Sequence, residues 1–182
     1  MSIKKALFST RSLTQGGIIA ALYAALIFVN PLYSHGILQV RVSEALTILP
    51  LFTPVAIPGL FVGVLVANLF NPAGAHIIDI IFGSLATLSA ASLTYWLGRK
   101  MLILEMKNSA KEMVAFLIAM IPPIILNAIV VGGYLYILFY RQEYTAIAAM
   151  SLVGLGQVIA CYVLGSILYI ALRKVNKKSS LL

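Results

Sequence analysis

The long apolar stretches of this sequence decide what kind of protein it folds into. Several of them approach or exceed the ~20 apolar residues that a helix needs to cross a bilayer core of roughly 30 Å. Of the 182 residues, 62% are hydrophobic and only 10% are charged, whereas about a quarter of a soluble domain is charged. The sequence therefore predicts an all-α, multi-pass protein of the cell membrane, built as a single integral membrane domain.

Residues 44–70 are the part of the chain whose topology is hardest to predict. Four longer spans are expected at about 14–31, 76–97, 113–139 and 144–172. As one helix, the 27 residues of 44–70 would cover about 40 Å, but they include Pro50, Pro54 and Pro58. Proline breaks or kinks a helix interior. The segment is either one broken span or two short ones, at about 42–53 and 55–70, that meet near Pro54.

The basic residues favour two short spans. Six spans place both termini on the same side as the 98–112 loop, and that side then holds eleven basic residues against two, Arg41 and Arg141. With five spans, the best division is nine against four. Because cytoplasmic loops collect Lys and Arg, the sequence predicts six transmembrane helices with both termini in the cytoplasm.

The same distribution of charge excludes other classes of protein. The net charge of +8 comes from residues between and after the apolar blocks, so it indicates topology and not nucleic-acid binding. The single cysteine, Cys161, excludes an internal disulfide and is expected to be a packing residue. We predict no metal site, no cofactor and no catalytic residue, and the first apolar segment is expected to be retained and not cleaved as a signal peptide.

Polar residues inside the apolar segments are the candidate functional residues. An ion at bilayer depth costs about 2.5–3.5 kcal/mol, so it normally faces a protein interior or a wet cavity. In the six-span arrangement these residues gather in the outer halves of the spans or near their middle, and the cytoplasmic halves offer nothing comparable. We therefore expect a cavity that opens outward. The candidates are Arg41, Glu44, Asn68, Asp79, Asn127, Tyr134 and Gln157.

Most of the candidates also have a purely structural explanation, which the sequence leaves open. Arg41 and Glu44 lie three apart, on one face of a helix, where they could simply pair with each other at the surface. Asp79 could complement the N-terminal dipole of its helix. Asn127 and Gln157 could form hydrogen bonds between helices. Several such residues are expected on the same, outer side of the membrane domain, and this favours a binding site.

Two stretches resemble a known family. Residues 38–69, LQVRVSEALTILPLFTPVAIPGLFVGVLVANL, and residues 79–91, DIIFGSLATLSAA, are similar to the QueT family of queuosine-precursor transporters. The similarity extends over about residues 10–172. These transporters are substrate-binding (S) components of energy-coupling factor transporters. The resemblance implies a six-helix S-component fold and the uptake of 7-deazaguanine bases.

The resemblance also implies partners. An S component is energised by a separate transmembrane T subunit and two ATPases, and the sequence has no GxxxxGK[ST] phosphate loop of its own. S components carry an AxxxA face on the first helix that docks the T subunit. In GGIIAALYAAL, residues 16–26, small residues recur at i and i+4, which lets another helix approach closely. The matching residues are Ala20, Ala21, Ala24 and Ala25.

The chemistry of the ligand suggests roles for the candidates. A 7-deazaguanine has N–H donors along a guanidine-like edge, which one carboxylate can accept in parallel. An amide or Arg41 can donate to the ring carbonyl, and Tyr134 or Tyr136 can cover a ring face. A second carboxylate can neutralise the ammonium of an aminomethyl ligand. Glu44 and Asp79 are the two acids, and the sequence does not say which takes which end.

Three other functions remain open from the sequence. The chain could be an S component for another small vitamin-like or purine-like molecule, because one scaffold accepts many ligands. It could be an intramembrane enzyme that uses Glu44, Asp79 and His76, although no nucleophile pattern accompanies them. It could also be an assembly protein without a ligand. The sequence favours a non-enzymatic, substrate-binding subunit.

Overall fold

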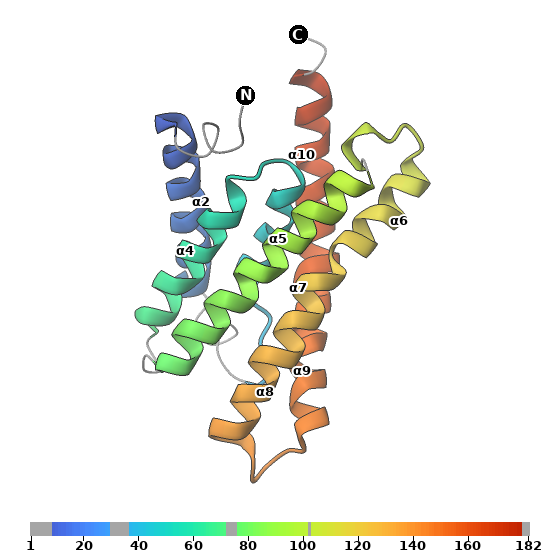
Figure 1. Ribbon diagram of the computed structural model, residues 1–182. Coiled ribbons are helices and arrows are strands. Elements are labelled where there is room, and N and C mark those ends of the chain that lie inside the picture. Colours follow the sequence, from blue (N-terminus) through green and yellow to red (C-terminus); the bar gives the residue numbers. More distant parts are fainter. Residues whose placement is uncertain (1–8, 30–36, 72–75, 102, 180–182) are drawn as a thin grey trace.

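The computed structural model describes residues 9–29, 37–71, 76–101 and 103–179. Within these ranges the secondary structure is helical, with no strand, and the helices form one elongated bundle (Figure 1). Residues 30 and 31 of the predicted first span lie outside the described residues, as do Lys4 and Lys5. The protein is therefore all-helical, as predicted.

Four helical segments are long and apolar enough to cross a membrane. They contain 20, 22, 32 and 31 residues, which at 1.5 Å per residue is about 30 Å or more. The first is α2 (Thr10–Val29), and the second is η2 (Asp79–Gly83) followed by α5 (Ser84–Lys100). The third comprises α6 (Ser109–Ala119), α7 (Ile121–Leu126), η4 (Asn127–Val131), α8 (Gly132–Leu135) and η5 (Tyr136–Tyr140). The fourth comprises α9 (Ala146–Val158), η6 (Ile159–Leu164) and α10 (Gly165–Ser179), and its 31 residues run from Ala146 to Asn176 within α10.

Four segments of these long helices, η2, η4, η5 and η6, are π-helical. A π segment adds a residue to a turn, so it changes which face of the helix the following side chains occupy, and such segments often occur at functional sites. Asp79 is the first residue of η2 and Asn127 is the first of η4. Gln157 lies two residues before η6. Two of the candidate residues therefore begin an irregular turn, and a third lies close to one.

Residues 44–70 do not form one helix. The structure has a 3-10 helix, η1 (Val42–Leu51), and an α-helix, α4 (Ala56–Leu69), with Pro54 in the turn between them. Pro50 lies inside η1, where its ring would clash with the carbonyl four residues earlier in an α-helix. Pro58 falls in the first turn of α4, where proline is tolerated. Pro54 thus accounts for the break, and Pro50 for the 3-10 geometry of η1.

The short helix η1 lies in the middle of the bundle. Eight of its ten residues are buried, and it contacts α2, α4, α5, η6 and α10. At ~2.0 Å per residue it is about 20 Å long, which is less than the hydrocarbon thickness of a bilayer. Because its neighbours surround it, η1 needs no lipid-facing surface. This central position allows side chains of η1 to meet residues from several other helices.

Glycines bring α4 directly against α2. A Cβ atom at Gly59 would lie 2.9 Å from the carbonyl oxygen of Gly16, and one at Gly63 would lie 2.8 Å from the Cβ atom of Tyr23. Small residues four apart allow this close approach of two helices. The contact fixes α2 beside α4 and, with it, the position of the Tyr23 ring.

The outside of the bundle is apolar. Val29 is 83% exposed, Ile147 is 78% exposed and Ile167 is 64% exposed, and apolar surface of this extent marks an interaction with lipid or protein. The beginning of α2 and the end of α10 lie at one end of the bundle, together with the end of α5 and the beginning of α6 (Figure 1). The basic residues of these helix ends therefore gather there, while Arg141 follows η5 at the opposite end.

Candidate functional site

Six polar side chains from five elements meet inside the bundle, in the half that lies away from the beginning of α2 and the end of α10 (Figure 1). We call this group the polar cluster. Arg41, Glu44 and Asn68 are buried at 4%, 0% and 0% exposure. Tyr23 and Tyr134 are also buried, and Asp79 is partly buried. The polar cluster consists of Tyr23 (α2), Arg41 (the N-cap of η1), Glu44 (η1), Asn68 (α4), Asp79 (η2) and Tyr134 (α8).

Glu44 is held by Tyr23. The Tyr23 hydroxyl donates a hydrogen bond of 2.6 Å to Oε1 of Glu44. The second carboxylate oxygen, Oε2, is buried and has no hydrogen-bond partner among the described residues. A buried carboxylate oxygen without a donor is costly, and the same oxygen is available to an incoming N–H group.

Asp79 is held by the side chains of Asn68 and Tyr134. The Asn68 Nδ2 atom donates to the main-chain oxygen of Asp79 at 3.0 Å and to its Oδ1 at 3.4 Å. The Tyr134 hydroxyl also donates to Oδ1. Gly83 makes room for this arrangement, since a Cβ atom there would lie 3.0 Å from both Asn68 Nδ2 and Asp79 Oδ1. Oδ1 of Asn68 is buried without a partner among the described residues.

Arg41 interacts with both halves of the polar cluster. It interacts electrostatically with both carboxylates, Asp79 and Glu44, and with the hydroxyls of Tyr23 and Tyr134. Two carboxylates and one guanidinium give the cluster a formal charge of −1. A buried site with this balance favours a ligand that brings N–H donors or a positive charge. Because Arg41 and Glu44 are both buried, a surface ion pair does not explain them.

Asn127 and Gln157 are buried and form hydrogen bonds with other groups. Nδ2 of Asn127 donates to the carbonyl of Pro123, one turn earlier in the same helix, at 2.9 Å. Oε1 of Gln157 lies 3.9 Å from the sulfur of Cys161, which is itself 3.9 Å from the main-chain oxygen of Glu44. Of the seven candidates, the structure thus brings together Arg41, Glu44, Asn68, Asp79 and Tyr134, whereas the hydrogen bonds of Asn127 and Gln157 given above go to Pro123 and Cys161 and not to side chains of the cluster.

Two further residues escaped the sequence analysis. Tyr23 shares a helix face with Ile19 and Ile27, which are core residues, so its position alone indicated only packing. Gln39 is 1% exposed and precedes Arg41 by two residues. The signal that could have found Gln39 is its position two residues before a charged candidate in a non-helical segment.

The opposite half of the bundle contains a second buried ionic group, which the sequence analysis did not expect. Nε of Arg173 donates to Oε1 of Glu112 at 2.6 Å, and the Tyr169 hydroxyl donates to the same oxygen at 2.8 Å. Arg173 also bonds the carbonyl of Met106 at 3.3 Å. The expectation that this half has no comparable polar group was wrong. Its groups bond to one another, which indicates a structural tie between α6 and α10.

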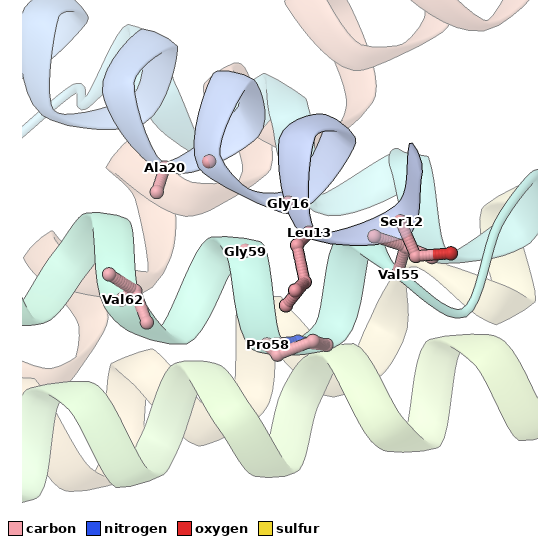
Figure 2. Close-up of a pocket in the computed structure, with 9 residues that line it drawn as sticks. Ser12, Leu13, Gly16, Ala20, Val55, Pro58, Gly59 and Val62 are labelled. Carbon is pink, nitrogen blue, oxygen red and sulfur yellow. The ribbon is translucent and has the colours of Figure 1, made fainter. Parts of the chain in front are cut away.

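The predicted docking residues divide between two faces of α2. Ala24 is buried against the core that α2 forms with α4, and Ala20 is partly buried. Ala21 and Ala25 are exposed, and nothing lies within 4 Å of a Cβ atom built at Gly17. Beside this face, side chains of α2 and α4 line a groove of about 230 Å³ (Figure 2). Its lining is mainly apolar or small and includes Leu13, Gly16, Ala20, Pro58 and Val62.

No metal ligand set is found at any of these places: among the described residues, no three His, Cys, Asp or Glu side chains lie together as metal ligands would. What the polar cluster offers is hydrogen-bonding groups and charge inside an apolar bundle. Ionisable residues inside membrane segments commonly mark substrate pathways. Long apolar helices around such a site define a multi-pass membrane transport protein.

The comparison with family models identifies the family. The model described as QueT transporter matches residues 13–174, which is most of the chain, so this chain belongs to the QueT transporter family. The resemblance inferred from residues 38–69 and 79–91 is thereby confirmed. No curated protein and no solved structure matches the chain. Membership of a transporter family favours transport over the intramembrane-enzyme alternative.

Proposed function

We propose that this chain is the substrate-binding S component of an energy-coupling factor transporter, and that its substrate is a 7-deazaguanine base, a precursor of queuosine. Membership of the QueT family supports a transporter for such a precursor. The observation that carries the proposal is the buried polar cluster, because its unpartnered oxygens suit a ligand rich in N–H donors.

The ligand fits the cluster chemically. The guanidine-like edge of a 7-deazaguanine presents parallel N–H donors. Oε2 of Glu44 is free to accept one of them, and Oε1, which accepts from Tyr23, has a second lone pair for the other. Arg41 is a donor suited to the ring carbonyl. The formal excess of one negative charge suits an aminomethyl group, whose ammonium Asp79 is placed to neutralise. Asp79 therefore contributes more to the binding affinity for the aminomethyl base than to that for the cyano base.

The topology of the proposal has six spans with both termini in the cytoplasm. In it, η1 and α4 are the second and third spans, joined by the turn at Pro54. The basic residues at the ends of α2, α5, α6 and α10 support this orientation, because cytoplasmic ends collect Lys and Arg. The polar cluster then faces the exterior, from which a scavenged base arrives.

Replacing Glu44 with glutamine is expected to weaken binding of 7-deazaguanines by about 10- to 150-fold, because a charge-assisted hydrogen bond contributes about 1.5–3 kcal/mol. Glutamine keeps an oxygen for the Tyr23 hydroxyl, so the fold is retained. The measurement is a calorimetric or thermal-shift titration of the purified protein with the cyano and aminomethyl bases. A saturated wild-type protein should gain about 2.7 kcal/mol at a hundredfold excess of ligand over the dissociation constant.

The matched control is Glu143→Gln, which makes the same change at an exposed glutamate of the loop between η5 and α9. It should bind like the wild type. If the wild type binds another purine or a vitamin and no deazaguanine, the substrate assignment fails while the S-component assignment stands. If it binds no small molecule at all, an assembly protein without a ligand becomes the better description.

We further propose that the T subunit docks on the exposed small face of α2 formed by Gly17, Ala21 and Ala25, beside the groove between α2 and α4 (Figure 2). Small side chains allow a partner helix to approach closely. Ala20 and Ala24 face α4 and pack α2 against it. The two ATPases then drive transport through the T subunit.

Replacing Ala21 with leucine is expected to abolish uptake and co-purification with the T subunit and the ATPases, because the larger side chain holds the partner helix away. Ligand binding by the isolated chain should not change, since Ala21 faces outward. Ala171→Leu on α10 is the control, because Ala171 is also exposed. Normal uptake by the Ala21 variant would place the docking surface elsewhere.

A further inference from the structure

Gln39 is a buried amide in a non-helical segment. It lies in residues 39–41, just before η1. Ile37, Gln39 and Arg41 are buried, whereas Leu38 is 53% exposed and Val40 is only partly buried. In an extended chain, alternate side chains point to the same side, and the backbone of Arg41 is extended. The Gln39 side chain therefore faces the same interior as Arg41 of the polar cluster.

The Gln39 carboxamide forms no hydrogen bond within the part of the chain that the structure describes. Both Oε1 and Nε2 are buried and have no hydrogen-bond partner among the described residues. Leaving a buried donor and a buried acceptor unsatisfied is costly, and native proteins do so rarely. An apolar side chain of similar size would be favoured at this position if only folding mattered. The amide is therefore better explained by a partner from outside the chain.

The position of Gln39 is fixed by α9. A Cβ atom at Gly156 would lie 1.9 Å from the main-chain oxygen of Gln39 and 2.8 Å from its carbonyl carbon. The backbone of α9 thus touches the backbone of Gln39 directly, and only glycine permits this. A residue held in this way presents its side chain in a defined place, which is what a specificity-determining contact requires.

We propose that Gln39 reads the second polar edge of the heterocycle, where the pyrrole N–H lies next to a ring nitrogen. This proposal rests on the proposed function. If Glu44 takes the guanidine-like edge, the remaining edge with an adjacent donor and acceptor is this one, and it is the same in the cyano and aminomethyl bases. A carboxamide carries the complementary acceptor and donor. Gln39 is then the residue that rejects rings lacking the pyrrole N–H.

The test compares 7-deazaguanine with its furopyrimidine analogue, in which an oxygen replaces the pyrrole N–H at almost unchanged size. The wild type should prefer 7-deazaguanine by about 10- to 100-fold, because a lost hydrogen bond leaves a buried group unpaired. Gln39→Met keeps the length of the side chain and removes its polar atoms. This variant should bind 7-deazaguanine about 10- to 100-fold more weakly than the wild type and should bind the two rings about equally.

The melting temperature without ligand provides a second measurement. It should stay the same or rise in Gln39→Met, because an unpaired buried amide is removed. The control, Gln142→Met, changes an exposed glutamine and should leave both affinities unchanged. The inference is overturned if the variant melts several degrees lower, if its affinity is unchanged, or if it keeps the preference for the pyrrole ring. No deazaguanine binding by the wild type would instead refute the proposed function, and this inference with it.

Discussion

Replacing Gly156 with alanine is expected to abolish ligand binding and to lower the melting temperature by several degrees. The added Cβ atom would lie 1.9 Å from the Gln39 oxygen, far closer than two such atoms can approach. Both contacting atoms of the neighbour are main-chain atoms, so no side-chain rotation relieves the overlap. The segment before η1 must move away from α9. We expect a loss of about 3 kcal/mol or more in the free energy of unfolding.

The displacement should also disturb the polar cluster, because Arg41 follows Gln39 by two residues. Melting of the purified protein and titration with a 7-deazaguanine measure the two effects. Gly154→Ala is the matched control on the same helix, where the added Cβ atom would meet only the Ala128 side chain, at 3.2 Å. A Gly156 variant that folds and binds like Gly154→Ala would contradict the close contact between α9 and residue 39.

Replacing Arg41 with methionine is expected to have a comparably large effect. The guanidinium is buried at 4% exposure and interacts with both Asp79 and Glu44. Removing one partner of a buried ionic group leaves an uncompensated charge, which costs about 3–5 kcal/mol. Binding of the ring should also be lost, because Arg41 is the donor proposed for its carbonyl. The measurements are the melting temperature and the affinity for the cyano base.

Two further variants test whether the effect of Arg41→Met comes from the lost charge balance. Arg141→Met removes an exposed arginine and should change neither quantity. The double variant Arg41→Met/Glu44→Gln should be less destabilised than the sum of its parts, because it removes one acid together with the cation. Simple additivity in this double-mutant cycle would show that Arg41 does not compensate the charge of Glu44.

The sequence indicated the broad architecture well because its signals are local. The length of an apolar run against the thickness of a bilayer identifies the four long helices without any tertiary contact. The prolines of 44–70 likewise predict a break wherever the segment lies. Neither signal predicts that η1 is a 3-10 helix in the centre of the bundle, since this depends on the helices that surround it.

The candidate site was predicted only in part, for a related reason. Charged side chains in apolar segments are conspicuous, so Arg41, Glu44 and Asp79 were visible in the sequence. Asn127 and Gln157 were equally conspicuous, yet their hydrogen bonds go to Pro123 and Cys161 and not to a side chain of the cluster. The position of Tyr23 in the sequence indicates only a core residue. In the structure its hydroxyl bonds to Glu44, 21 positions away. Which polar groups meet depends on helix rotation, which hydrophobicity does not record.

The sequence by itself determined that this protein is an all-helical membrane protein of the QueT family, because apolar run length and a local motif are properties of consecutive residues. Only the tertiary structure decided which side chains form the polar cluster and which atoms in it stay unpartnered. Those outcomes depend on how the helices are rotated against one another and on glycines that set helix spacing. Such features act between segments far apart in the chain.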